Sequence, residues 1–190
     1  MSLIAVSGSQ GTGKSTLIDA LKYPSITRKT SRSILSDWGV TLSQVNNDRD
    51  LTVRFQDEIL TRKLEDEAAA VQSDQQFITE RTYADLFVYA LVAIGKDNEY
   101  SDWLDGYYER CKEAQRSYSR VFYLTAGHFK PVNDGVRAIN EHYSRMVDLT
   151  MYEYTCRMSP TVTPIHTANL DLRVQIVKDA INGRPNPELQ

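Results

Sequence analysis

The chain has few of the residues that build disulfide scaffolds or metal clusters. Its 190 residues include only two cysteines, Cys111 and Cys156, which stand far apart and lack the spacing of metal ligands. This usage indicates a reducing compartment rather than a disulfide framework. The three histidines, His128, His142 and His166, share no spacing that is typical of a metal site.

Long apolar runs are also missing. Hydrophobic residues make up 41% of the sequence, yet no run approaches the roughly 20 residues that cross a bilayer, so we expect no membrane segment. An apolar run opens at Leu3 and leaves no room for a signal peptide, so we expect a cytoplasmic protein, in the host cytoplasm if the chain is viral. The formal net charge of −3 provides no general attraction to nucleic acid.

The sequence does contain a regular alternation of short β-rich runs with longer helical ones. Strand candidates lie at about 3–7, 24–28, 76–80, 120–125 and 162–166. The longest helical pattern runs from about 48 to 72, and others begin near Tyr83, Ser101, Arg137 and Asp171. This alternation predicts one α/β domain over residues 1–190, with a doubly wound, parallel, five-stranded sheet and helices on both faces.

A complete G-x-x-x-x-G-K-S motif follows the first strand candidate and precedes a helical run, which is the context of a phosphate-binding loop. The motif and the threonine after it comprise Gly8, Ser9, Gln10, Gly11, Thr12, Gly13, Lys14, Ser15 and Thr16. The loop amides and the positive end of the following helix face the anion. Lys14 can reach the β- and γ-phosphates, and the Ser15 hydroxyl can bind Mg²⁺. We therefore predict a P-loop NTPase fold that binds ATP with Mg²⁺.

Glu80 and Arg81 close the third strand candidate, where a P-loop protein usually keeps the acid that organises Mg²⁺ or the nucleophile. A motor ATPase would typically carry a longer apolar run and an Asp-Glu pair there, whereas here an arginine follows a single acid. We predict that Glu80 binds the metal or orients the acceptor hydroxyl. The segment from Glu80 to Ala90 resembles the nucleoside and nucleotide kinases, and this resemblance implies that Arg81 holds a phosphate. The alternative is a surface ion pair at a helix start, where glutamate also suits the helix dipole.

The segment of about 127–145 is placed like the lid of small P-loop kinases, whose arginines close over the phosphates. Arg137 and Arg145 stand eight residues apart and would share one face of a helix. Both would stabilise the charge that spreads over the transferring phosphoryl group. The alternative is a solvated helix with scattered arginines.

A basic cluster follows the second strand candidate and runs Thr27-Arg28-Lys29-Thr30-Ser31-Arg32. Nucleotide kinases carry a Thr-Arg pair here that faces the acceptor, and Thr27-Arg28 resembles it, so we predict that Arg28 joins Arg81 in binding substrate. The thymidylate kinases continue with Glu-Pro-Gly, which this chain lacks. The substitution makes the mouth of the pocket more positive and would suit a larger polyanion. The alternative is a solvated basic helix start.

Glu80-Arg81 followed by Tyr89-Ala90 resembles the nucleoside and nucleotide kinases of the thymidylate kinase superfamily. With residues 8–15 and 130–145, the chain is similar to small phage kinases of that superfamily that phosphorylate 5-hydroxymethyluracil in viral DNA during thymidine hypermodification. The resemblance implies an ATP-dependent kinase with a nucleotide-type acceptor, the best candidate being a modified pyrimidine in DNA. Two alternatives stay open, a kinase of free deoxynucleoside monophosphates and a P-loop ATPase switch. The adenine contacts are expected in the loop around residues 167–169.

Overall fold

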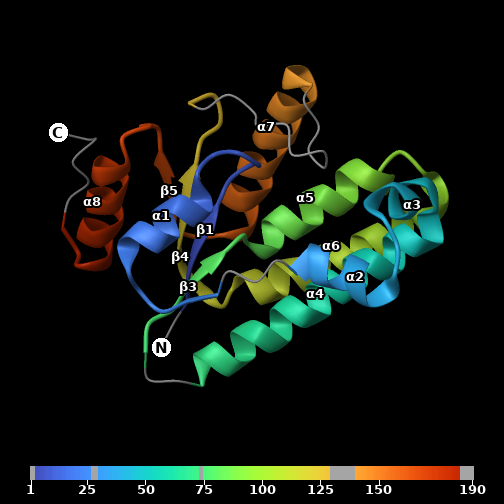
Figure 1. The fold of residues 1–190 in the computed structure, drawn as a ribbon, viewed down its shortest axis with the longest axis horizontal. Coiled ribbons are helices and arrows are strands. Elements are labelled where there is room, and N and C mark those ends of the chain that lie inside the picture. Colours follow the sequence, from blue (N-terminus) through green and yellow to red (C-terminus); the bar gives the residue numbers. More distant parts are fainter. Residues whose placement is uncertain (1–2, 27–29, 73–74, 129–139, 185–190) are drawn as a thin grey trace.

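The computed structural model describes residues 3–26, 30–72, 75–128 and 140–184. Its strands are β1 (Leu3–Ser7), β2 (Ser25–Ile26), β3 (Ile78–Glu80), β4 (Tyr118–Leu124) and β5 (Val162–Ile165). They form one five-stranded sheet in the order β2-β3-β1-β4-β5, and every neighbouring pair is parallel. Figure 1 shows the sheet between two groups of helices. The predicted α/β fold with a parallel sheet covered on both faces is confirmed.

Eight α-helices and one short 3-10 helix lie within these described ranges. They are α1 (Lys14–Leu21), α2 (Thr30–Trp38), α3 (Leu42–Asn47), α4 (Arg49–Val71), α5 (Tyr83–Ile94), η1 (Asn98–Tyr100), α6 (Ser101–Gln115), α7 (Glu141–Met158) and α8 (Leu170–Ile181). The starts of α5, α7 and α8 are fixed by the side chains of Thr82, Asn140 and Asn169, each of which accepts a backbone N–H of the first turn. None of the helices in the described ranges is long and apolar enough to cross a membrane.

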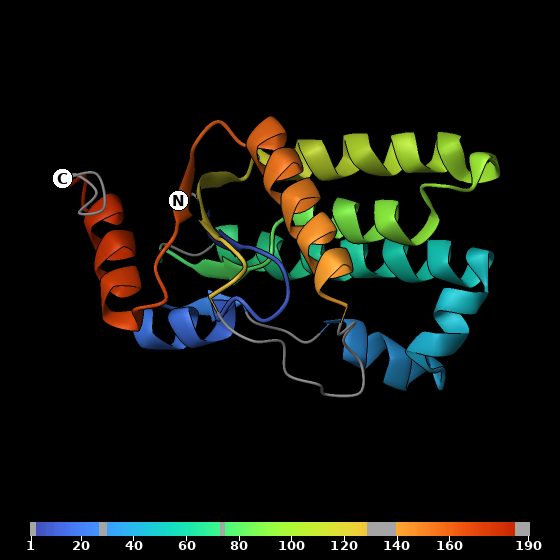
Figure 2. The same cartoon turned by 90° about the horizontal axis from the view of Figure 1, so that it is seen from above.

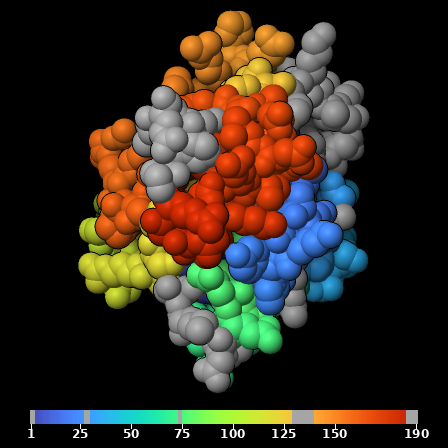
Figure 3. All heavy atoms as spheres, turned by 90° about the vertical axis from the view of Figure 1, so that its left-hand side faces the viewer, coloured from blue at the N-terminus to red at the C-terminus, as the bar shows by residue number. Residues whose placement is uncertain are grey.

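One face of the sheet is covered by α1 and α8, which lie side by side in Figure 3. Ile4 and Val6 of β1 pack there against Leu17 of α1 and Ile176 of α8. Side chains alternate along a strand, so the intervening Leu3 and Ala5 belong to the opposite face. All five residues of β1 are buried, as expected for the central strand of a sheet covered on both sides.

The other face of the sheet is covered by α4, α5, α6 and α7. Figure 2 shows α7 crossing the other helices of this group. A smaller core lies farther out, where α2 and α3 pack on α4 through Ile34, Val45 and Phe55. Helix α4 therefore contacts both the main core and the two short helices that precede it.

The five predicted strands are present, although β3 is shorter than the sequence pattern indicates. The predicted end of the second strand, at 27–28, lies outside the described residues. The pattern did not reveal α3 as a helix, and it offered a helix start near α2 only as the alternative for the basic cluster, because α2 buries only Ile34 and α3 buries only Val45. The predicted lid of about 127–145 lies largely outside the described residues, which omit 129–139. The predicted helix start at Arg137 falls in that gap, and the described part of α7 begins at Glu141.

Candidate functional site

The loop between β1 and α1 has the backbone of a phosphate-binding loop. Gly8, Gly11 and Gly13 have φ values of 135°, 79° and 87°, in a region that glycine adopts without a steric penalty. A Cβ on Gly8 would stand 2.5 Å from the carbonyl oxygen of Leu124, so the loop packs directly on the end of β4. Gly13 begins α1 without a side-chain cap, and the first turn of α1 contains no acidic residue. The amides of this helix start are therefore available to an anion.

Side chains within the loop hold its shape. Lys14 is 5% exposed, and its ammonium donates to the carbonyl oxygens of Gly8 and Ser9, at 2.8 Å each. The Thr12 hydroxyl donates to the Ser9 carbonyl at 2.9 Å. Lys14 is thus enclosed by the loop, and its role toward the β- and γ-phosphates stays a prediction.

The structure brings Ser15 and Glu80 together. The Ser15 hydroxyl donates to the Glu80 carboxylate, at 3.1 Å to Oε1 and 3.0 Å to Oε2. Their contact follows from the sheet order, because β3 lies beside β1 and Glu80 is in register with Val6, just before the loop. The two residues predicted to serve the metal therefore face one another, Ser15 from the first turn of α1 and Glu80 from the carboxyl end of β3.

This pair fits a magnesium ion better than a metal held by many protein ligands. Mg²⁺ prefers oxygen donors and usually takes one or two ligands from the protein, with phosphates and water completing its shell. Ser15 and Glu80 supply a hydroxyl and a carboxylate in contact. Among the described residues there is no group of three His, Cys, Asp or Glu side chains that could hold a metal without a substrate.

Arg81 follows Glu80 in an unusual backbone conformation, with φ at 71°. Its N–H donates to the Val6 carbonyl at 2.9 Å, and its guanidinium lies over the ring of Tyr89, 5.1 Å from the centroid. The guanidinium Nη1 is buried and has no hydrogen-bond partner. Tyr89 does most to raise the pKa of Arg81 above its usual value, against the opposing effect of burial, and the nearby carboxylates add to the rise. A positive charge with a free donor therefore sits beside Glu80, which is the property a phosphate-holding arginine needs.

Asp85 is a buried residue of this region that sequence reasoning missed. Its Oδ1 accepts hydrogen bonds from the hydroxyls of Ser7 and Thr82, whereas its Oδ2 is buried without a partner. Ser7 directly precedes the loop, so Asp85 ties the start of α5 to the end of β1. The sequence did carry a signal, because Thr82 and Asp85 have the Thr-x-x-acid spacing of a capping box.

Arg173 of α8 was missed as well. It is 2% exposed and donates to the Thr167 carbonyl from Nε and to the Thr12 carbonyl from Nη1, at 2.6 Å each. It thereby links the phosphate-binding loop to the loop of residues 167–169, where the adenine contacts are expected. No sequence motif marks this arginine.

Two of the predicted arginines lie outside the described residues, and a third is exposed on α7. Arg28 and Arg137 lie outside the described residues, as do Thr27 and Lys29. Arg145 is exposed on the second turn of α7, and its side chain makes no hydrogen bond or ion pair within the described part of the chain. The predicted common face of Arg137 and Arg145 therefore stays a prediction.

The loop, the parallel sheet and the acid on the neighbouring strand have a counterpart in a known family. Residues 3–172 match a family model described as an AAA domain. The chain belongs to this AAA domain family. No curated protein matches its sequence.

Solved structures resemble this AAA domain in fold at low sequence identity. Deoxyadenosine kinase from M. mycoides with bound dATP superposes with a TM-score of 0.71 at 16% identity, covering 95% of this chain and 99% of that one. Shikimate kinase from Acinetobacter baumannii in complex with shikimate gives a TM-score of 0.58 at 11% identity, covering 96% and 94%. The NadR protein in complex with NAD and AMP-PNP gives 0.66 at 12% identity, covering 96% of this chain and 49% of NadR.

These likenesses place the AAA domain among folds that kinases also use. The predicted P-loop fold is confirmed, whereas the narrower resemblance to phage 5-hydroxymethyluracil kinases stays a prediction.

Proposed function

We propose that the protein is an ATP-dependent kinase in which residues 1–190 act as one domain. The observation that carries the proposal is the contact between Ser15 and Glu80, which joins the loop's metal-binding hydroxyl to the acid of the next strand. The fold shared with deoxyadenosine kinase and shikimate kinase supports the same reaction class. The γ-phosphoryl group would move in line from ATP to a hydroxyl of the acceptor.

The residues take distinct roles in this reaction. The loop amides and Lys14 hold the phosphates, and Arg81 offers its unpartnered Nη1 to an acceptor or transferring phosphate. Ser15 and Glu80 would hold Mg²⁺, which neutralises charge on the phosphate oxygens when bound. Glu80 would also orient the acceptor hydroxyl. Arg28, Arg137 and Arg145 are the further candidates for acceptor and phosphoryl contacts.

An ATPase switch or motor is the rival class. Such proteins usually carry a long apolar strand that ends in paired acids. Here β3 has three residues and ends in a single acid, Glu80, followed at once by Arg81. The partly buried and positively charged Arg81 beside the metal pair favours a second phosphate-bearing or hydroxyl-bearing substrate over water.

The acceptor we propose is of the nucleotide type. The sequence resemblance favours 5-hydroxymethyluracil in DNA, and the fold shared with deoxyadenosine kinase favours a free deoxynucleoside or its monophosphate. A labelling experiment distinguishes these candidate acceptors. The protein is incubated with γ-labelled ATP and a panel of thymidylate, deoxynucleosides, plain DNA and hydroxymethyluracil-containing DNA. We expect label in one acceptor class. Release of labelled phosphate with no labelled acceptor would contradict the kinase and support the switch.

A further inference from the structure

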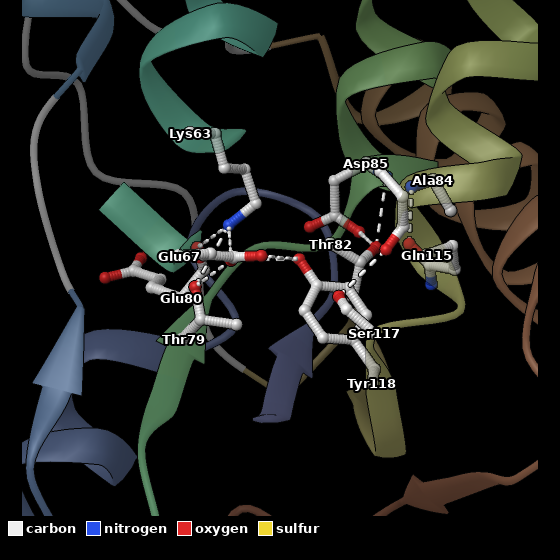
Figure 4. A network of polar contacts seen from close by, with 11 residues as sticks. Lys63, Glu67, Thr79, Glu80, Thr82, Ala84, Asp85, Gln115, Ser117 and Tyr118 are labelled. Atoms are coloured by element: carbon white, nitrogen blue, oxygen red, sulfur yellow. Dashed lines mark hydrogen bonds and ion pairs between the residues drawn. The ribbon is translucent and has the colours of Figure 1, made fainter. Parts of the chain in front are cut away.

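A buried polar network lies beside the carboxyl end of β3 (Figure 4). Lys63 and Glu67, one turn apart on α4, form an ion pair of 2.6 Å with side chains 9% and 3% exposed. The Thr79 hydroxyl of β3 accepts from Lys63 Nζ at 3.0 Å and donates to Glu67 at 2.7 Å. Lys63 Nζ also donates to the backbone carbonyl of Glu80 at 3.4 Å. Helix α4 is therefore bonded to the last two residues of β3.

Two tyrosines close the network on its other side. The Tyr118 hydroxyl donates to both carboxylate oxygens of Glu67, at 3.0 Å each. Tyr83 stacks on Tyr118 with ring centroids 5.5 Å apart, and the Lys63 ammonium lies 5.5 Å from the Tyr83 centroid. Burial raises the pKa of Tyr118 well above its usual value, and the Glu67 charge adds to the rise, so the phenol remains a donor. The carboxylate is thus held from several directions.

Such a network is not the simplest way to stabilise a core. The attraction within a buried ion pair seldom exceeds the cost of removing both charges from water, and well-packed apolar residues often serve as well. Thr79 and Glu80 are adjacent in a strand, so their side chains point to opposite faces. The network therefore cannot reach the phosphate-binding loop itself, and it can act there only through the strand.

We infer that the Lys63–Glu67–Thr79 network positions Glu80. By bonding the Thr79 side chain and the Glu80 carbonyl to α4, it fixes where the strand ends and holds the Glu80 carboxylate against the Ser15 hydroxyl. Lys63, Glu67 and Thr79 are then positioning residues that contact neither ATP nor acceptor. The inference rests on the proposed function for the role of Glu80, and outer-shell partners of this kind often tune a metal site.

Two variants test the inference, with one matched control. Thr79→Val removes the bridging hydroxyl at nearly constant size, and Lys63→Met with Glu67→Leu replaces the whole ion pair by apolar groups. The control, Tyr107→Phe, deletes another buried hydroxyl bonded to α4, which donates to the Gln56 carbonyl at 3.2 Å. For each protein we would measure the midpoint of thermal unfolding, the tightening of AMP-PNP binding by Mg²⁺, and kcat and KM with the acceptor that the labelling panel identifies.

We expect the substitutions to affect function in a way that their effect on stability does not explain. In both network variants, the factor by which Mg²⁺ tightens AMP-PNP binding should be about tenfold smaller than in the wild type. The kcat should fall on the order of 10- to 100-fold, because the carboxylate is displaced. AMP-PNP binding measured without Mg²⁺ should stay within about twofold, since the phosphate-binding loop is intact. The control should keep the Mg²⁺ effect and kcat, even where its unfolding midpoint falls as far as that of Thr79→Val.

Other outcomes separate this inference from the proposed function. The positioning role would be overturned if the network variants fold and Mg²⁺ tightens their AMP-PNP binding as much as in the wild type. It would also be overturned if Mg²⁺ does not tighten AMP-PNP binding by the wild-type protein. If the wild type labels no acceptor while Thr79→Val loses the Mg²⁺ effect, the kinase proposal fails and the positioning role stands. Should the double variant not fold, Thr79→Val decides alone.

Discussion

Arg173 of α8 donates from Nη1 to the carbonyl oxygen of Thr12 at 2.6 Å, across 161 positions of sequence. The same guanidinium holds the Thr167 carbonyl through Nε. One buried side chain therefore fixes the end of the phosphate-binding loop relative to the loop that follows β5. In a protein that binds a nucleotide along these two loops, this spacing decides whether base and phosphates fit together.

Replacing Arg173 with Met should weaken nucleotide binding. The substitution removes two charge-assisted hydrogen bonds, so we expect a stability loss of about 3 kcal/mol and a rise in KM for ATP of about tenfold. Lys178→Met, an exposed change on the same helix, is the control. Thermal unfolding and steady-state kinetics with varied ATP measure both effects. Unchanged KM in a destabilised Arg173→Met variant would show that the arginine supports only the core.

Gly8 belongs to a local motif, whereas Arg173 acts through contacts made across the fold, and this difference explains what the sequence could reveal. The loop from Gly8 to Ser15 is a local motif whose conformation is set by its own glycines and by the strand and helix beside it. Glu80 could be found because parallel strands place their carboxyl ends together, so the acid that ends β3 must lie near the loop that follows β1. Both predictions needed only short-range pattern and general topology.

Arg173 and the burial of the Lys63–Glu67 pair could not be found in that way. Each depends on which helix packs on which strand, because the contacts to Thr12 and to Thr79 join separate parts of the sequence. For Asp85 the local spacing from Thr82 could be read from the sequence, but the contact with Ser7 could not. A lysine followed four residues later by a glutamate reads equally well as an exposed helical pair, and only the packing of α4 on β3 shows that this one is buried. Sequence patterns report local geometry, whereas these contacts arise from the tertiary fold.

Two loop glycines should respond differently to alanine. At Gly8 the new Cβ would stand 2.5 Å from the Leu124 carbonyl, at φ 135°, so we expect Gly8→Ala to cost at least about 3 kcal/mol. At Gly11 nothing lies within 4 Å, and only the positive φ of 79° opposes a Cβ, so Gly11→Ala should cost about 1–2 kcal/mol. Chemical denaturation of both variants tests the order. Equal losses would mean that the packing of the loop on β4 is unimportant.

The two cysteines should differ in reactivity. Burial raises the pKa of the Cys111 thiol to about 12, whereas Cys156 is exposed. At pH 8 a thiol reagent should therefore titrate one cysteine in the folded protein and both after denaturation. Because the folded pKa lies above the unfolded value, Cys111 contributes its full stability below about pH 8.5 and loses it as the pH rises toward 12. Rapid titration of both thiols in the folded protein would contradict this burial.

Lys14→Ala should abolish phosphoryl transfer. The ammonium is enclosed by the loop and would neutralise charge that grows on the phosphates during the reaction, so we expect turnover to fall at least about 100-fold. Lys112→Ala, which changes an exposed ion pair on α6, should leave turnover unchanged. Initial rates with saturating ATP measure the effect. Near-normal transfer by Lys14→Ala would mean that the chemistry takes place elsewhere.

Glu80→Gln tests whether Glu80 serves the metal or acceptor or only forms an ion pair at a helix start. The amide keeps the size of the side chain and removes the charge that Mg²⁺ or an acceptor proton needs, so transfer should fall about 100-fold or more. ATP should still bind, because Lys14 and the loop amides remain. Glu113→Gln, an exposed change on α6, serves as the control. Binding by calorimetry and transfer by labelled ATP are measured on the same preparations. Full transfer by the Glu80 variant would reduce its contact with Ser15 to a structural one, because a carboxylate that serves the reaction cannot be replaced by a neutral amide.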